Sequence, residues 1–151
     1  MIERLLPDGT VIARSDGMAH DLFPVAVGAA EGEALGEWVV REGATRTVEV
    51  GFGYGLSSEG RRFELAFVDG NHRFDRIFLG LVYLGRLLGP GAVVFVDDYQ
   101  LPAVARAASF CLTNLGWRLE AVSPADELHQ WAVLRTSAVP DTRPFDYYVE
   151  F

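Results

Sequence analysis

The sequence contains no lysine, only one cysteine and no long uninterrupted apolar run. All 13 basic residues are arginines, a bias that fits a GC-rich, bacterial-type coding sequence and removes lysine as a catalytic base. The single Cys111 cannot form an internal disulfide and is expected to fill an apolar helix face. No apolar stretch approaches the roughly 20 residues that span a bilayer, so a membrane-spanning helix is not expected.

A basic cluster is also missing, and the net charge is −8. Binding to a nucleic acid backbone requires many basic residues on one face, so nucleic acid is not an expected partner. Half of the residues are hydrophobic and 23% are charged, which excludes a disordered chain. A chain of 151 residues buries roughly 70% of its unfolded surface and needs no disulfide or metal to fold. The first residues lack the pattern of an export signal, so we expect a cytoplasmic protein.

Apolar periodicity and turn signals predict alternating helices and strands after an irregular or short-stranded segment at 1–28. Helices are predicted at 29–42, 73–88 and 104–115, strands at 47–50, 63–68, 92–96, 117–122 and 130–135, and a last short strand at 145–151. The continuous apolar run at 92–96 is typical of a central parallel strand. We therefore expect a single α/β domain over 1–151: a Rossmann-like, doubly wound, mostly parallel sheet in three αβα layers, with an antiparallel C-terminal edge hairpin.

A glycine-rich turn follows the predicted strand at 47–50. Gly51, Gly53 and Gly55 allow the backbone to turn sharply and to approach a ligand without obstruction by a Cβ atom. In an open α/β sheet, ligands bind beyond the carboxyl ends of the strands, where Glu49 also lies. The pattern favours a nucleotide-like cofactor over a simple tight turn.

With Glu49 two residues before the first glycine, the pattern resembles the class I S-adenosylmethionine-dependent methyltransferases. Segments 67–72 (FVDGNH), 87–91 (LLGPG) and 94–99 (VFVDDY) are similar to later motifs of small-molecule O-methyltransferases, and the resemblance covers roughly 30–136. It implies S-adenosylmethionine as the cofactor and a small-molecule hydroxyl as the methyl acceptor. By the same resemblance, Glu49 and the three glycines line the methionine end of the cofactor, where a carboxylate can pair with an ammonium group. Asp69 is a further candidate for cofactor binding.

The acids after two later strands match the metal ligands of related metal-dependent O-methyltransferases. Asp69, Asp97 and Asp98 would together supply hard oxygen donors for Mg²⁺. However, consecutive residues of a strand point in opposite directions, so Asp97 and Asp98 share a site only if the chain has already turned. One of the two acids can instead cap the next helix.

His72 is a candidate catalytic residue, together with Asp69. A neutral imidazole just past a strand end can remove a proton from a substrate hydroxyl. A local hydrogen bond at the start of the next helix is the alternative role of His72. Structural roles are favoured for His20 and His129, which have no partner cluster in the sequence. Tyr99 and Trp131 are weaker candidates for an acceptor pocket.

The sequence departs from the family pattern after Gly55. Only 13 residues separate Gly55 from Asp69, where the fold normally places a helix, a strand with the ribose-binding acid, a second helix and another strand. Either the printed sequence joins two stretches that a further segment separates, near 57–61, or the protein is a natural remnant that has lost half of its cofactor pocket. The first explanation is favoured.

Two other functions remain open. An NAD(P)-dependent oxidoreductase usually has a third glycine where this chain has Leu56. A non-catalytic binding protein derived from the methyltransferase fold would be favoured if the short middle is natural. The sequence identifies neither the acceptor nor the oligomeric state, and a homodimer is one option.

Overall fold

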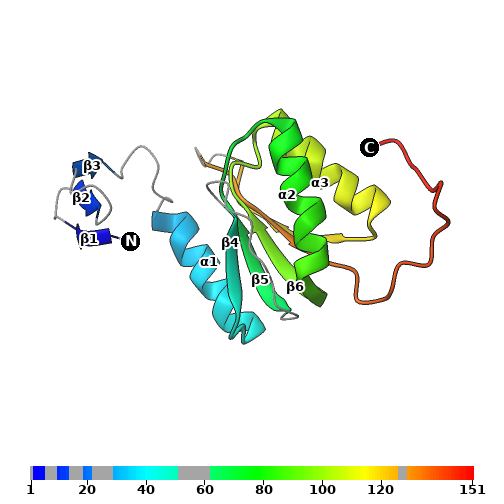
Figure 1. Ribbon diagram of the computed structural model, residues 1–151, viewed down its shortest axis with the longest axis horizontal. Coiled ribbons are helices and arrows are strands. Elements are labelled where there is room, and N and C mark those ends of the chain that lie inside the picture. The colour runs from blue at the N-terminus through cyan, green and yellow to red at the C-terminus, as the bar shows by residue number, and fades with distance from the viewer. Residues whose placement is uncertain (1, 6–9, 14–18, 22–28, 51–61, 126–128) are drawn as a thin grey trace. The chain divides into compact units, whose positions relative to one another are not determined.

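The computed structural model describes residues 2–5, 10–13, 19–21, 29–50, 62–125 and 129–151, in two compact units that divide after Gly32. The first unit contains a three-stranded antiparallel sheet in the order β1-β2-β3 (Figure 1). Its strands are β1 (Ile2–Leu5), β2 (Thr10–Ala13) and β3 (Ala19–Asp21). The leading residues therefore include short strands, one of the two forms that the sequence predicts.

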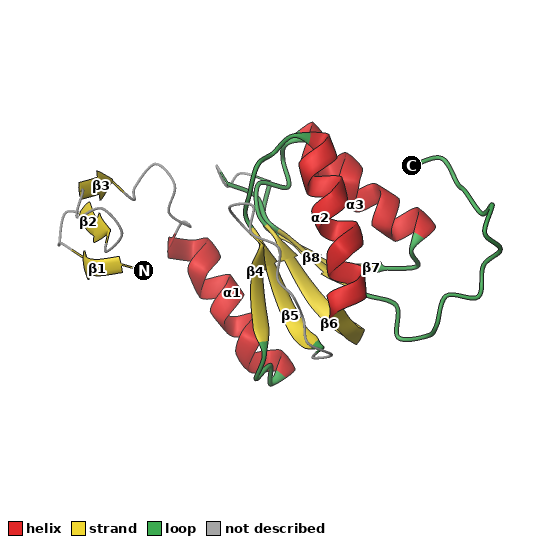
Figure 2. Ribbon diagram, in the orientation of Figure 1, coloured by secondary structure: helices red, strands yellow, loops and turns green. Residues whose placement is uncertain are grey.

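The second unit is built on a five-stranded mixed sheet with the order β4-β5-β6-β8-β7 (Figure 2). The strands are β4 (Thr47–Val50), β5 (Phe63–Val68), β6 (Leu88–Val96), β7 (Arg118–Val122) and β8 (Ala132–Arg135). The helices are α1 (Ala29–Glu42), of which the residues from Glu33 belong to this unit, α2 (Phe74–Leu87) and α3 (Pro102–Asn114). The first three strands are parallel, and β8 is antiparallel to both β6 and β7. None of the described helices combines the length and the apolar character that a bilayer crossing requires.

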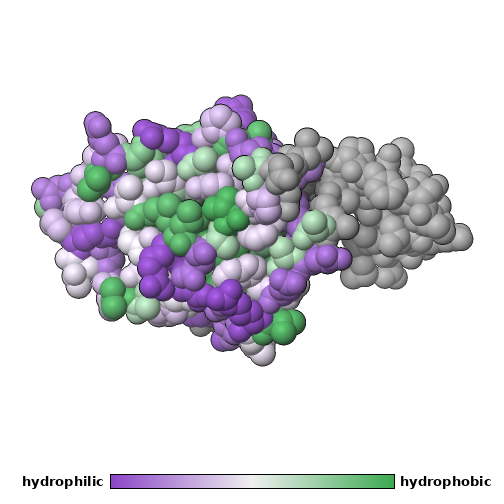
Figure 3. All heavy atoms as spheres, turned by 180° about the vertical axis from the view of Figure 1, so that it is seen from behind, coloured by the Kyte–Doolittle hydropathy of each residue, from purple (hydrophilic) through white to green (hydrophobic). Residues whose placement is uncertain are grey.

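Helices lie on both faces of this sheet. Ala66 and Val68 of β5 belong to the core cluster that also contains buried residues of α2 and α3. Side chains alternate along a strand, so Leu65 and Phe67 point to the opposite face, where they line a small cavity together with residues of α1. The predicted three-layer αβα fold with its antiparallel edge hairpin is confirmed. Seen from behind, the described surface has an apolar strip in its middle, with a band of hydrophilic residues beside it and smaller apolar spots toward the edges (Figure 3).

One predicted boundary differs from the structure by four residues, and the bounds of the other predicted helices and strands over 29–135 agree within two residues. Strand β6 begins at Leu88, because Gly89–Gly91 continues the strand instead of forming a turn. Thr136 Oγ1 donates to the Gly89 carbonyl at 3.1 Å, and Gly91 N donates to the Ser137 carbonyl at 3.3 Å, so the chain after β8 pairs with this part of β6.

The predicted strand at 145–151 is wrong, because this segment contains no strand. The side-chain amide of Asn114 takes the place of a neighbouring strand: it donates to the Val149 carbonyl and accepts from Val149 N, both at 2.8 Å. Phe151 then packs edge-on against Phe110 of α3. The C-terminal segment is thus held by a helix and not by the sheet.

Strands β4 and β5 pair directly with each other, with Val48 opposite Ala66 and Val50 opposite Val68. Residues 51–62 connect them, and a connection of about a dozen residues is the minimum for a parallel pair. The strand with a ribose-binding acid, which the resemblance places between them, has no counterpart among the described strands. As a result, β4 is at the end of the described sheet order.

Candidate functional site

The carboxyl ends of the three parallel strands are aligned. Val68 is in register with Val50 on one side and with Val96 on the other. Asp69 and Asp97 come directly after β5 and β6, and Asp97 N donates to the Val68 carbonyl at 3.0 Å. The fold therefore brings the two predicted acids to neighbouring positions at the same edge of the sheet.

The other candidate residues with ionisable side chains, Glu49, His72, Asp97 and Asp98, all influence the pKa of Asp69. Burial raises the pKa of the Asp69 carboxyl, and the neighbouring charges of Asp97, Asp98 and Glu49 raise it further, while His72 opposes them. These groups come from different strand ends and loops, and together they form a local concentration of negative charge. Such a site favours a cationic ligand.

The backbone at Asp98 determines whether the two consecutive acids, Asp97 and Asp98, point in opposite directions as they would in a regular strand. Its φ of 52° is the only left-handed backbone conformation of a non-glycine residue in the described ranges. The chain therefore turns at this point, and the Asp97 carboxylate accepts a hydrogen bond from Asp98 N at 2.5 Å. Aspartate tolerates this conformation better than most residues, and unusual backbone geometry of this kind is concentrated at functional sites.

His72 lies in the loop between β5 and α2, and its ring reaches Asp98. Nε2 is 3.0 Å from Asp98 Oδ2, an ion-pair distance, although the two groups are not aligned as a hydrogen bond. Nε2 is buried while the side chain is 37% exposed overall. The structure thus places the predicted base against one of the predicted acids.

His129 also contacts Asp98, which the sequence does not predict. Its Nδ1 lies 3.3 Å from Asp98 Oδ1, so Asp98 has a histidine on each carboxylate oxygen. The two residues are 31 positions apart, and only the return of the chain through β7 toward β8 brings them together. Apart from its residue type, His129 carries no local sequence signal for this contact.

The donor set does not fit a metal ion as it is arranged. Among the residues that the structure describes, no group of three or more acidic, histidine or cysteine side chains has the geometry to hold one. Asp97 Oδ1 accepts a hydrogen bond from Asp98 N, and Asp98 Oδ1 accepts one from Gln100 Nε2 at 2.8 Å. We therefore assign no chemical step to a metal.

The cofactor half of the site is described only in part. Gly51, Gly53 and Gly55 lie outside the described residues. Glu49 is exposed near the end of β4 and lines a cavity of about 150 Å³ between α1 and the sheet. Its carboxylate is accessible to a cationic group, as the expected role at the methionine end of a cofactor requires.

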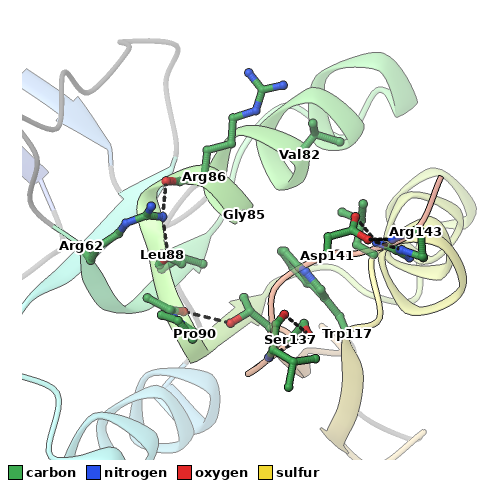
Figure 4. Close-up of a pocket in the computed structure, with 14 residues that line it drawn as sticks. Arg62, Val82, Gly85, Arg86, Leu88, Pro90, Trp117, Ser137, Asp141 and Arg143 are labelled. Atoms are coloured by element: carbon green, nitrogen blue, oxygen red, sulfur yellow. Dashed lines mark hydrogen bonds and ion pairs between the residues drawn. The ribbon is translucent and has the colours of Figure 1, made fainter. Parts of the chain in front are cut away.

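A larger cavity, of about 740 Å³, lies at the other end of the sheet (Figure 4). Trp117 forms part of its wall, with Arg62 on one side and the Asp141–Arg143 ion pair on the other. None of the predicted site residues lines this cavity, so it does not belong to the candidate site.

The remaining candidates have packing roles in the structure. Tyr99 packs against the core, and Trp131 stacks on Phe95 with ring centroids 5.1 Å apart. Cys111 is fully buried, and burial raises its pKa to about 12, so the thiol is not a nucleophile. The side chain of His20 lies outside the described set.

No family model and no curated protein matches this sequence. Solved structures do match it. The cofactor-bound Rv0187 from MTB is 15% identical, with a TM-score of 0.60 over 74% of this chain and 82% of its own. TomG, an O-methyltransferase from Streptomyces achromogenes in complex with SAM, is 16% identical, with a TM-score of 0.60 over 78% and 82%. An O-methyltransferase from Bacillus cereus in complex with SAH is 14% identical, with a TM-score of 0.57 over 74% and 83%. The chain therefore has the Rossmann-like fold of class I methyltransferases.

Proposed function

We propose that this protein is an S-adenosylmethionine-dependent methyltransferase that transfers the methyl group to a hydroxyl oxygen of a small molecule. The observation that carries the proposal is the convergence of His72, Asp69 and Asp98 at the carboxyl edge of a methyltransferase-like sheet. Ligands of open α/β sheets bind at this edge.

The negative charge of the site suits the cofactor. S-adenosylmethionine carries an ammonium group and supplies an electrophilic methyl group on a positively charged sulfur. Glu49 is exposed beside the glycine-rich segment and would pair with the ammonium group. The carboxylates beyond β5 and β6 would favour the cationic ligand over its neutral product.

His72 would act as the general base. Because Nε2 faces Asp98, Nδ1 is the ring nitrogen left to accept a proton from the acceptor hydroxyl. Bound S-adenosylmethionine would supply the electrophilic methyl group, and loss of the hydroxyl proton to His72 would leave the acceptor oxygen free to form the new C–O bond. The proton ends on His72, where the Asp98 carboxylate stabilises the imidazolium.

The test is methyl transfer from S-[methyl-¹⁴C]adenosylmethionine to a panel of small phenols, sugars and aliphatic alcohols. We expect label in at least one acceptor and a loss of about 100-fold or more in turnover for His72→Asn. His20→Asn is the matched control and should retain full turnover. Cofactor binding without transfer to any acceptor would favour the non-catalytic binding protein, and NAD binding in place of S-adenosylhomocysteine would favour the oxidoreductase.

Metal assistance is tested in the same assay. The hypothesis that Asp69, Asp97 and Asp98 hold Mg²⁺ predicts loss of turnover in EDTA and recovery when Mg²⁺ is restored. Unchanged turnover in EDTA would contradict the metal hypothesis and leave His72 as the proposed base without metal assistance.

A further inference from the structure

The Asp98 carboxylate lies between two histidines that approach different oxygens. His72 Nε2 is 3.0 Å from Oδ2, and His129 Nδ1 is 3.3 Å from Oδ1. The first contact belongs to the proposed base, while the second comes from the loop before β8. The two oxygens can therefore have separate functions, one toward the reaction and one toward the protein scaffold.

The loop that carries His129 is fixed to the turn that carries Asp98. Tyr99 N donates to the Gln130 carbonyl at 2.7 Å, and Gln130 N donates to Gln100 Oε1 at 2.9 Å. The other side-chain atom of Gln100, Nε2, donates to Asp98 Oδ1 at 2.8 Å. His129 directly precedes Gln130, so these bonds set its backbone beside Asp98.

This arrangement restrains the orientation of the carboxylate. With Gln100 and His129 both at Oδ1, rotation of the Asp98 side chain would separate that oxygen from two partners. Oδ2 is thereby kept toward His72. A carboxylate that accepts from one side and faces a histidine on the other is a common way to fix the orientation of an imidazole.

We propose that His129 is a positioning residue, which holds Asp98 so that its second oxygen orients His72; this rests on the proposed role of His72 as the base. The His129 side chain is 59% exposed, although that of Asp98 is 14% exposed, so solvent screens this contact on the histidine side and its contribution to stability is small. Its loss should therefore change the environment of His72 without unfolding the protein.

The experiment is long-range ¹H–¹⁵N NMR of the histidine rings at one fixed pH, in full-length protein. The chain has only three histidines, so His20→Asn and His72→Asn assign the signals. His129→Ala should shift the His72 ring nitrogens in the same direction as Asp98→Asn does. His129→Asn keeps a donor close to the position of Nδ1 and should restore most of the original shift, and both His129 variants should melt within about 2 °C of the parent.

His72 signals that are identical in the parent and in His129→Ala, but shifted in Asp98→Asn, would overturn the proposal. A His129→Asn variant that behaves like His129→Ala would also overturn it. The spectra need neither cofactor nor acceptor, so this failure is distinguishable from failure of the proposed function, which a separate titration with S-adenosylhomocysteine reports. With an active acceptor in hand, His129→Ala should lower kcat about 10-fold and leave the KM for the cofactor unchanged.

Discussion

The ionised Asp69 carboxyl is unfavourable at its position in the folded protein. Burial and the nearby carboxylates raise its pKa in the folded protein, while the unfolded chain has the ordinary aspartate pKa of about 3.9. The folded state therefore binds the proton more tightly than the unfolded state. As the pH rises through the interval between the two pKa values, the ionised carboxyl lowers the stability of the fold, and the full effect is present above both.

Replacing this charge should stabilise the protein at neutral pH. We expect Asp69→Asn to raise the Tm at pH 7 by about 2 °C or more, the shift that about 1 kcal/mol gives in a chain of this size. The gain should shrink as the pH falls and be absent near pH 3, where the aspartate is protonated in both states. Scanning calorimetry across this range measures it, with the exposed Asp146→Asn as the control. A Tm lowered by Asp69→Asn at pH 7 would contradict the account.

At the scale of residues, the sequence predicts which acids lie at the same edge of the sheet but not the contacts that their side chains make. Asp69 and Asp97 are predictable because each follows an apolar strand, and parallel strands end at the same edge of a sheet. The left-handed backbone of Asp98 and its contact with His129 are not predictable, because both depend on how the turn after β6 meets the loop before β8. The sequence also does not predict that the Asp97 and Asp98 carboxylates accept hydrogen bonds within the protein, from Asp98 N and Gln100 Nε2.

At the scale of elements, one ion-pair network joins α1 to the hairpin. The Arg135 guanidinium of β8 donates to both carboxylate oxygens of Glu42 at 2.8 and 2.9 Å, and to Glu120 of β7 at 3.0 Å. It also donates to the Gly91 carbonyl at 2.9 Å. The hydrogen bonds from Arg135 lower the pKa of Glu42. The Arg135 side chain, from β8, thus contacts α1, β6 and β7.

Removing that side chain should destabilise the fold more than removing an exposed one. We expect Arg135→Met to lower the free energy of unfolding by about 2 kcal/mol, because it removes the hydrogen-bond donor of the partly buried Glu42 carboxylate and leaves Glu120 only its longer contact with Arg118, at 3.5 Å. The control is Arg46→Met, which breaks the more exposed pair with Glu64 and should lower the free energy of unfolding clearly less. Urea denaturation measures both. Equal losses would show that the network is not a structural link.

The predicted bounds of α1, β4 and β5 agree with the structure, because glycines, an acid at a strand end or a change of periodicity mark them in the sequence. The beginning of β6 was predicted four residues late. Its Gly-Pro-Gly sequence is a stop signal for a helix, but pairing with the chain after β8 makes it part of a strand. Local signals thus predict elements well where no long-range partner competes with them.

At the scale of the whole molecule, the direct pairing of β4 with β5 determines how much of a cofactor pocket this chain can form. If a further segment of about 50 residues belongs between these strands, the mass of the protein in its native cells should exceed 16.6 kDa by the mass of that segment. Mass spectrometry of the intact native protein measures this. We expect the larger mass, and agreement with 16.6 kDa would instead identify a natural remnant.

The central claim is that the carboxyl edge of β4, β5 and β6 binds S-adenosylmethionine, and the most direct test is calorimetric titration with S-adenosylhomocysteine. We predict one binding event per chain, weakened about 10-fold or more by Glu49→Gln, since a charge-assisted hydrogen bond contributes about 1.5 to 3 kcal/mol. Glu37→Gln, which changes an exposed glutamate of α1, should leave the affinity unchanged. Absence of heat with the intact native protein, or equal affinity in Glu49→Gln, would contradict the claim.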